Sequence, residues 1–350
     1  MASVSESSVA AAPRCPVCAT VSPEVIRTFT LSQVATHFIP ENRDRDRHEE
    51  LRDLLVEGWG GREAVAIHCC PSCSFGFAEP WAAGPTRFYN LVTESDPHYP
   101  SDRWEFRRTI NALATERFVG MGNEKRTRIV DVGAGSGAFL KLVRSSDVGR
   151  TFRPIAIEYD RGALANLEQE GFETFAGSLQ ELAATSLGRS DFGAICLFQT
   201  LEHIADVHGT FRAVTALLEP TGNVFISTPY APSIELQEEL ARFWDLPPNH
   251  VGRWVRSAFE AVAEQHALRV VEWELEPAPR VVLAWRLAVY AVLGKAYSER
   301  SLAGRINALR IRSVRGPAKR VLAIGYMPKM LAAWPRLVPV TQWVRLAHRA

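Results

Sequence analysis

The stretch that decides the fold is Arg128-Ile-Val-Asp-Val-Gly133-Ala-Gly-Ser-Gly137-Ala-Phe-Leu-Lys-Leu-Val143. Its first residues, rich in branched side chains, predict a β-strand, and the apolar spacing after the glycines predicts a helix. Glycine has no Cβ, so the backbone of the turn can lie close to a ligand. The first N–H groups of the helix have no partner within it. The stretch therefore predicts a strand, a ligand-binding turn and a helix.

A second predicted strand, Pro154-Ile-Ala-Ile-Glu158, ends in an acid 25 residues after Gly133. In doubly wound α/β proteins, a glycine turn after one strand and an acid at the end of the next bind the nucleotide and its ribose. A carboxylate at this place can accept hydrogen bonds from both ribose hydroxyls. The pair predicts an α/β fold with a Rossmann-like, doubly wound sheet.

The glycine turn alone leaves two kinds of ligand open. Gly133-x-Gly135-x-x-Ala138 satisfies the dinucleotide fingerprint, so an NAD(P)-dependent oxidoreductase is one candidate. The second candidate is a nucleotide-like ligand that carries an amino-acid group. Asp131 before the turn favours this ligand, because a carboxylate there can meet its cationic amino group. Two further strand patterns continue the α/β alternation, one ending before Gln199 and one after the turn at Gly222.

Four segments resemble, in this order, the motifs of the class I S-adenosylmethionine (SAM) dependent methyltransferases. They are DVGAGSG (131–137), IEYD (157–160), LFQTLEHI (197–204) and LLEPTGNVFIS (217–227). The resemblance covers about residues 125–275 and implies that SAM is the cofactor. Two cysteine pairs ahead of such a domain also occur in bacterial methyltransferases of sugars and natural products, including nucleotide-sugar C-methyltransferases.

The resemblance also implies which residues surround SAM. Glu158 would hold the ribose hydroxyls, and Tyr159 would pack on the adenine. Ser178 and Leu179 come where the family contacts adenine, although Ser178 is equally suited to cap the helix that begins at Leu179. The other implied cofactor-binding residues belong to the glycine turn and to the exit of the fourth strand: Asp131, Gly133, Ala134, Gly135, Gly137, Gln199 and Leu201.

The acceptor side is predicted from residues 243–254, FWDLPPNHVGRW, which follow the fifth strand. They resemble the PPHH-x-x-x-W segment of bacterial methyltransferases in polysaccharide and natural-product pathways. Asn249 replaces the first His, so His250 alone carries over as a candidate catalytic base. His203, after the fourth strand, is the second candidate catalytic residue. Each has a structural alternative: His250 would be a hydrogen-bonded loop residue, and His203 a helix residue whose hydrogen bonds are satisfied within the structure.

Two charged neighbours of these histidines are expected to have no catalytic role. Glu202 is expected to face solvent or to stabilise a helix start. Arg253 is expected to make an anion or structural contact, as a guanidinium that stays charged suits that role better than proton transfer.

Five of the six cysteines form two clusters, Cys15-Pro-Val-Cys18 and Cys69-Cys70-Pro-Ser-Cys73. In a chain without a visible export signal, paired cysteines indicate metal ligands rather than disulfides. Two C-x-x-C pairs supply four thiolates, the closed tetrahedral set of structural Zn²⁺. The spacing leaves Cys69 out, so the expected ligands are Cys15, Cys18, Cys70 and Cys73. Reduced thiols in a small apolar cluster are the alternative.

The net charge of +1 hides an uneven distribution. Residues 281–350 carry 13 Lys and Arg and one acid, Glu299, whereas the other 280 residues carry 27 basic and 38 acidic side chains. A basic segment that also holds Trp285, Trp334 and Trp343 suits three partners: an anionic membrane surface, a phosphorylated substrate, or the acidic remainder of the chain.

The sequence divides into five expected parts: a disordered tail (1–12), a zinc-binding module (13–85), a helical connector that would close over the cofactor (86–126), a SAM-binding domain (127–275) and a basic helical segment (276–350). The final β-hairpin that the resemblance implies is not evident after residues 268–274. With 47% hydrophobic and 23% charged residues, the chain is globular rather than disordered. Without a secretory signal or an 18-residue apolar run, a cytoplasmic protein is expected, with peripheral membrane contact through the basic segment as an option.

These observations predict a SAM-dependent methyltransferase that acts on a hydroxyl, or as second choice a carbon, of a sugar, glycan or secondary metabolite. An NAD(P)-dependent oxidoreductase, a zinc-containing nucleic-acid methyltransferase and a non-catalytic SAM-binding scaffold stay open. A nucleic-acid substrate is disfavoured because the fourth strand exits into Gln199-Thr-Leu-Glu202, and not into an Asp/Asn-Pro-Pro-Tyr motif.

Overall fold

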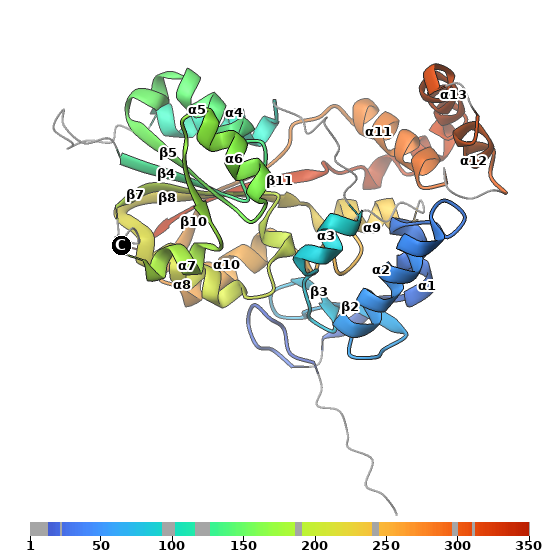
Figure 1. Cartoon of the computed structure of the whole chain (residues 1–350), viewed down its shortest axis with the longest axis horizontal. Helices are drawn as coiled ribbons and strands as arrows, with labels where there is room; N and C mark the ends of the chain where they lie inside the picture. Colours follow the sequence, from blue (N-terminus) through green and yellow to red (C-terminus); the bar gives the residue numbers. More distant parts are fainter. Residues whose placement is uncertain are drawn as a thin grey trace, which may run out of the picture.

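Two β-sheets, each flanked by helices, make up the computed structural model (Figure 1). The sequence predictions for residues 1–12 and for parts of 86–126 lie outside the described residues. Those residues are 13–21, 23–92, 102–115, 127–185, 191–239, 245–295, 300–309 and 312–349.

The large sheet has seven strands in the order β10-β11-β8-β7-β4-β5-β6. The five strands from β6 to β8 are parallel, and β11 is antiparallel to both of its neighbours. The strand order reverses between β4 and β7, and ligands of open α/β sheets bind beyond the carboxyl ends of the strands at such a point. The predicted doubly wound α/β fold is confirmed. The strands are β4 (Thr127–Val132), β5 (Phe152–Glu158), β6 (Glu173–Ala176), β7 (Phe192–Phe198), β8 (Leu218–Pro229), β10 (Leu268–Leu275) and β11 (Thr341–His348).

Helices cover both faces of this sheet (Figure 1). Successive side chains of a strand point to opposite faces, so Ile129 and Val130 of β4 belong to two different core clusters. The cluster around Ile129 packs on one group of helices: α4 (Trp104–Thr115), α5 (Ala138–Ser145) and α6 (Arg161–Gln169). The cluster around Val130 packs on the other: α7 (Leu179–Ala184), α8 (Val207–Leu217) and α10 (Arg256–Gln265). Short 3-10 helices, η1 (Asp147–Arg150) and η2 (Leu201–His203), follow α5 and β7.

The N-terminal part is a four-stranded antiparallel sheet in the order β1-β2-β3-β9. Its fourth strand comes from far along the chain and pairs with β3. The core also crosses the boundary, because Cys15 and Phe75 share a cluster with Trp254 and Phe259. The N-terminal module is therefore packed into the sheet domain. Its elements are β1 (Glu24–Thr30), α1 (Leu31–Phe38), α2 (Arg45–Gly58), β2 (Ala64–Cys69), β3 (Gly76–Glu79), α3 (Thr86–Val92) and β9 (Gly252–Arg253).

The C-terminal end corrects the sequence prediction. Residues 276–350 were expected to be helical, but β11 lies between β8 and β10 and completes the large sheet. Trp343 at its centre is fully buried, and its indole N–H donates to Thr109 Oγ1 at 2.9 Å. The helical prediction is therefore wrong for 341–348, and a domain boundary at residue 275 divides the sheet. The hairpin signal is missing because a long helical insertion separates β10 from β11.

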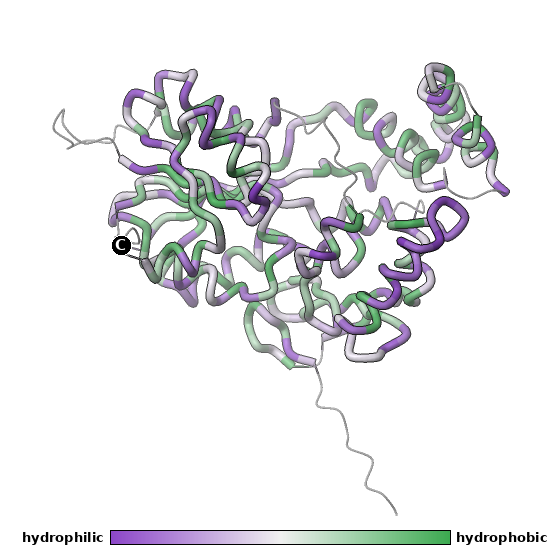
Figure 2. The backbone as a smooth tube through the Cα atoms, in the orientation of Figure 1, coloured by the Kyte–Doolittle hydropathy of each residue, from purple (hydrophilic) through white to green (hydrophobic). Residues whose placement is uncertain are grey.

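That insertion forms a helical lobe, residues 280–336, at the upper right of Figure 1. Its apolar core includes Leu236 of α9 (Ala231–Glu239), which joins the lobe to the sheet domain. α11 is apolar along most of its length (Figure 2). None of the described helices is long and apolar enough to cross a membrane. The lobe consists of α11 (Arg280–Leu293), α12 (Leu302–Asn307), α13 (Arg312–Ile324), α14 (Met327–Ala332) and η3 (Trp334–Arg336).

Candidate active site

The glycine turn lies at the carboxyl end of β4, at the switch point of the sheet. Gly133, Gly135 and Gly137 all have positive φ, at 73°, 52° and 69°. A Cβ at Gly137 would lie 2.3 Å from Leu167, whereas a Cβ at Gly135 would meet nothing within 4 Å. The turn therefore needs glycine for its backbone, and at Gly135 it leaves open space in which a ligand can approach.

Glu158, the last residue of β5, is held against this turn. Its Oε2 accepts a hydrogen bond from the N–H of Gly135 at 2.9 Å, and its Oε1 accepts one from the N–H of Tyr159 at 2.7 Å. The two features that sequence analysis paired are therefore in contact. Oε1 also accepts a longer bond from the N–H of Asp160 at 3.3 Å. A carboxylate oxygen has two lone pairs, so Oε2 can still accept a hydrogen bond from a ligand.

Asp131 lies within the same group. It is buried at the end of β4, and burial, with the nearby charge of Glu158, raises its pKa well above the usual range. Arg103, at the start of α4, opposes this effect. Ala134 is buried in the turn, whereas the Tyr159 side chain is mostly exposed beside it. The predicted cofactor-binding residues at the ends of β4 and β5 thus lie around the same part of the sheet edge.

Ser178 caps α7, the alternative that the sequence left open. Its Oγ accepts from the N–H of Glu181 at 3.1 Å, and Glu181 Oε2 accepts from the N–H of Ser178 at 2.7 Å. Leu179 is buried in the core, so its side chain packs rather than projects. Both residues follow β6, the outer strand beside β5.

Gln199 begins the segment that leaves β7. Its φ is 53°, and its N–H donates to Ser227 O of β8 at 2.8 Å. Thr200 Oγ1 donates to Val132 O at 2.9 Å, which ties this exit to the glycine turn. Leu201, the other predicted cofactor-binding residue of this exit, is 1% exposed and packs in the core.

Two histidines from distant segments meet beyond this exit. The His203 and His250 rings lie 4.5 Å apart, edge to face. His250 Nδ1 lies 2.8 Å from Asp245 Oδ1, and His203 Nδ1 lies 2.6 Å from Asn249 O. A carbonyl and a carboxylate can only accept, so each Nδ1 carries the proton and each Nε2 is left with a lone pair.

The two histidines differ in pKa because their surroundings differ. Burial lowers the pKa of His203 to about 3, and the neighbouring His250 adds to that effect. Burial also acts to lower the pKa of His250, but the hydrogen bond and charge of Asp245 outweigh it, and the pKa is raised. A carboxylate that accepts the hydrogen bond from Nδ1–H of an imidazole makes Nε2 of that ring a better base. His250 is therefore the stronger candidate base of the two.

Three residues of this cluster were missed in the sequence. Glu202 was expected to face solvent or to stabilise a helix start. It lies in η2 but is 1% exposed, neither carboxylate oxygen has a hydrogen-bond partner among the described residues, and burial raises its pKa to about 7. Tyr89 of α3 places its hydroxyl 3.2 Å from His203 Nδ1, a long-range contact with no local signal. Asp245 did have a signal, since it stands five residues before His250 in the segment that was singled out.

Arg253 makes a structural contact, as predicted. It is 2% exposed on β9, and its guanidinium binds Glu238 of α9 at 2.5 Å and 3.2 Å. Trp81 of the N-terminal module donates to Ala205 O at 2.8 Å, just after η2. These contacts fix the module beside the two histidines.

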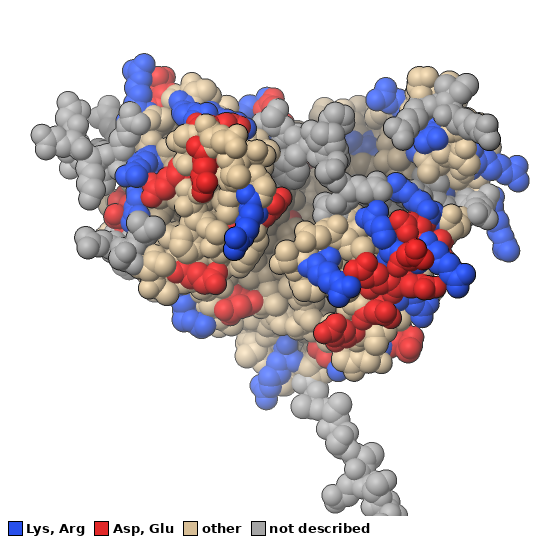
Figure 3. Space-filling model, viewed as in Figure 1, with Lys and Arg blue, Asp and Glu red and all other residues tan. Residues whose placement is uncertain are grey.

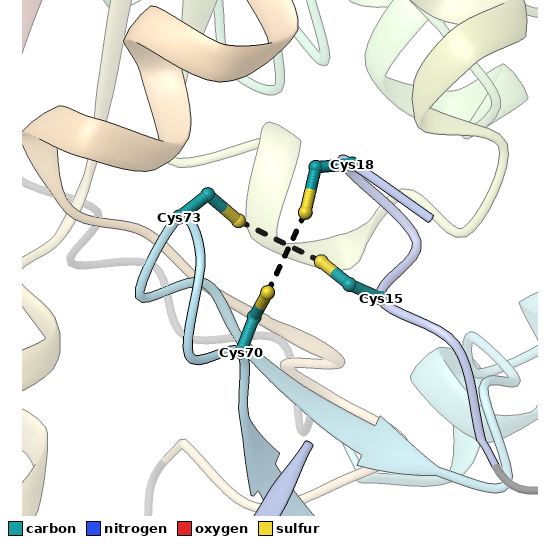
Figure 4. A group of neighbouring side chains, drawn as sticks. All are labelled: Cys15, Cys18, Cys70 and Cys73. Atoms are coloured by element: carbon teal, nitrogen blue, oxygen red, sulfur yellow. Dashed lines mark hydrogen bonds between the residues drawn. The ribbon is translucent and has the colours of Figure 1, made fainter. Parts of the chain in front are cut away.

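The four predicted cysteines are brought together (Figure 4). Cys15 Sγ lies 3.6 Å from Cys73 Sγ, and Cys18 Sγ lies 3.4 Å from Cys70 Sγ. All four sulfur atoms lie within 4.8 Å of one another. A tetrahedral ion with bonds of about 2.3 Å needs sulfur atoms about 3.8 Å apart, so the set fits a metal. Cys69 is outside the set, as its spacing predicted.

Comparison with known proteins identifies the family of the chain. A family model described as "methyltransferase domain" matches residues 103–308. C-methyltransferase NovU of Streptomyces niveus is 29% identical over 150 residues, which cover 41% of this chain and 33% of NovU. The ubiquinone biosynthesis O-methyltransferase of Ralstonia nicotianae is 28% identical over 134 residues, 37% of this chain and 54% of that protein.

Among solved structures, a SAM-dependent methyltransferase from Archaeoglobus fulgidus aligns with 15% identity and a TM-score of 0.44, over 69% of this chain and 92% of that one. The matches span only a third to about half of the length of the two curated relatives. The family model, in contrast, takes in more than half of this chain, including β4 to β10 and the glycine turn. The chain belongs to the methyltransferase domain family.

Proposed function

We propose that the protein is a SAM-dependent methyltransferase whose acceptor is a hydroxyl of a sugar, glycan or secondary metabolite. The observation that carries the proposal is the contact between Gly135 and Glu158 at the switch point of the sheet, with His203 and His250 beyond the next strand exit. The residues suited to bind a nucleotide-like ligand and the histidines suited to accept a proton thus lie along the same edge of the large sheet.

SAM, when bound, supplies a methyl group on a positively charged sulfur. Glu158 would accept hydrogen bonds from the ribose hydroxyls, and the turn at Gly135 has the open space for a close approach. Asp131 lies where a cationic amino group would be met, and that cation would favour its charged form. Tyr159, Ser178 and Gln199 border the same edge and are proposed contacts.

His250 is the proposed base on the acceptor side. Its Nε2 would take the proton of the acceptor hydroxyl, while Asp245 holds Nδ1–H and stabilises the charge that forms. His203, fixed by Asn249 O, would orient the acceptor through Nε2. Positioning contributes the rest, because an activated methyl group needs an acceptor aligned with it more than it needs acid catalysis.

A carbon acceptor is the second candidate. The name of NovU specifies C-methylation, whereas the ubiquinone relatives are O-methyltransferases. A base such as His250 serves both, since an acidic carbon also loses a proton. A nucleic-acid acceptor lacks support from the residues that follow β7.

We further propose that Cys15, Cys18, Cys70 and Cys73 bind one structural Zn²⁺. Four protein ligands leave no open position for substrate, so the ion would hold the module rather than react. Its role would be to keep Tyr89 and Trp81 in place beside the histidines.

A thermal-shift series with SAM, S-adenosylhomocysteine (SAH), NAD⁺ and NADH tests the proposed cofactor. We expect SAM and SAH to raise the melting temperature and the nicotinamide nucleotides to leave it unchanged. Stabilisation by NADH alone would instead support an oxidoreductase with the same glycine turn.

A further inference from the structure

The helical lobe, residues 280–336, carries most of the exposed apolar surface. Of fifteen large apolar side chains that are exposed in the described part of the chain, ten lie in this lobe. Single exposed apolar residues are ordinary, but a concentration of them marks a surface that something covers. The ten are Val281, Val282, Trp285, Leu293, Leu302, Leu309, Val314, Val321, Ile324 and Leu331.

On α11 these residues form a stripe. Val282, Trp285 and Leu293 are spaced i, i+3 and i+11, which places them on one side of a helix with 3.6 residues per turn. The opposite side packs into the lobe core through Leu283, Ala284, Leu287, Ala288 and Ala291. An ordinary surface helix is polar on its outer side. The outer side of α11 instead carries the three apolar side chains, beside Arg286, which binds Glu276.

α13 repeats the arrangement. Val314, Val321 and Ile324 are spaced i, i+7 and i+10, again on one side, and Val321 and Ile324 are 68% and 60% exposed. Arg320 is exposed next to this stripe. Exposed apolar side chains are therefore aligned on two helices of the lobe, with cations at their borders.

Apart from Glu299, which lies outside the described residues, the charged side chains of the lobe are all basic. Its described residues include no Asp or Glu, and its visible face shows blue side chains without red ones (upper right in Figure 3). Arg286 and Arg336 bind Glu276 and Glu239, outside the lobe, at 3.0 Å and 2.6 Å. The others make no ion pair with any described residue: Arg280, Lys295, Arg300, Arg305, Arg315, Lys319, Arg320 and Lys329.

We propose that the helical lobe docks the protein on the surface of an anionic lipid bilayer. A nucleic acid would pair with the cations but leave the apolar stripes in water. A bilayer with anionic headgroups offers negative charge and, directly beneath it, an apolar layer for Trp285, Val321 and Ile324. The contact is peripheral, since no described helix could cross the membrane. The inference rests on the lobe alone and not on the methyl acceptor.

Co-sedimentation of the full-length protein with phosphatidylcholine vesicles, with and without phosphatidylglycerol, tests the proposal. We expect binding only to the anionic vesicles. The double variant Val321→Asp/Ile324→Asp tests the stripe, and Arg320→Glu/Lys329→Glu tests the charge. Matched controls are Val25→Asp on β1, where Val25 is 52% exposed, and Arg150→Glu on η1, where Arg150 is 87% exposed. Truncation is unsuitable because β11 follows the lobe.

Each lobe variant should lower the partition coefficient about tenfold or more. Arg320→Glu/Lys329→Glu loses roughly fivefold for each cation removed from the surface, and Val321→Asp/Ile324→Asp places two charges where apolar side chains would enter the bilayer. The control variants should bind like the parent protein, and SAH should stabilise every variant equally, which separates this result from the cofactor proposal. Absence of parent binding to anionic vesicles, or equal binding by Val321→Asp/Ile324→Asp, overturns the proposal. A third result also overturns the proposal: the parent protein is a dimer that binds no vesicles, and Val321→Asp/Ile324→Asp converts it to a monomer. In that case a second copy of the chain covers the stripes.

Discussion

At the scale of single residues, Glu158 is the anchor of the proposed cofactor site. Replacing it with Ala removes hydrogen bonds to a charged acceptor, each worth about 1.5–3 kcal/mol, so SAH affinity should fall about 10- to 100-fold. Isothermal titration measures this. Asp147→Asn changes an acid that is almost fully exposed on η1 and should leave the affinity unchanged. If Glu158→Ala binds SAH within twofold of the affinity of the parent protein, the assignment of Glu158 to the site is wrong.

Asp245 should control the pKa of His250. Its hydrogen bond and charge raise that pKa against the effect of burial, so Asp245→Asn should lower it. If His250 is the base, the acidic limb of the kcat/KM profile should move to lower pH in the same variant, because the neutral imidazole persists there. NMR titration of the His250 ring measures the first effect without an acceptor. An unchanged or higher pKa would show that Asp245 has no such role.

The residues that sequence analysis found and those it missed differ in one respect. The glycine turn, Glu158 and the cysteine pairs act through local backbone or spacing, so short motifs contain them. Glu202 and Tyr89 contact segments that are far away in the chain. The residues next to them in the sequence give no sign of those contacts. The motif position of Leu201 likewise did not indicate that its side chain packs in the core.

At the scale of elements, the cysteine cluster should decide the stability of the N-terminal sheet. Cys70→Ser removes one proposed zinc ligand, and we expect zinc content near zero and a melting temperature lower by more than about 5 °C, equivalent to a few kcal/mol for a chain of this size. Elemental analysis and a thermal melt measure both. Cys69→Ser, the adjacent cysteine outside the cluster, should keep the metal. Equal zinc content in the two variants would refute the assignment.

The strands show why part of the fold was beyond prediction. The strands from β4 to β8 follow one another along the chain with a helix in each connection, so pattern alone indicated an alternating α/β sheet. β11 pairs with β8 and β10, yet it follows the whole helical lobe. A pattern read along the chain contains no signal for such a distant partner, and the last strand was therefore assigned to helix.

At the scale of the whole molecule, the acidic and basic parts of the chain only partly neutralise each other. Within the described residues beyond 280, four arginines bind acids of the preceding part: Arg286, Arg336, Arg345 and Arg349. Internal docking, one of the three partners expected for the basic segment, thus accounts for those arginines. Of the cations of the lobe without ion pairs, Arg315 and Lys319 bind Leu309 O and Asn307 Oδ1, and Lys295 lies over the Tyr326 ring. The proposed membrane surface would be met by the others.

The N-terminal module and the large sheet should open as one unit, because β9 and the cluster around Trp254 belong to both. Native-state hydrogen exchange at increasing denaturant should give the same opening free energy for β2 as for β4, with an earlier opening of the lobe, which has a separate core. A lower value for β2 than for β4 in the zinc-loaded protein would show that the module is independent.

A crystal structure of the protein with SAH is the most direct measurement of the proposed site. It should show the ribose hydroxyls on the Glu158 carboxylate, the ligand over Gly135, and the sulfur on the side of His203 and His250. SAH bound away from Glu158, or with its sulfur turned from both histidines, would contradict the methyl transfer proposed for this edge of the sheet.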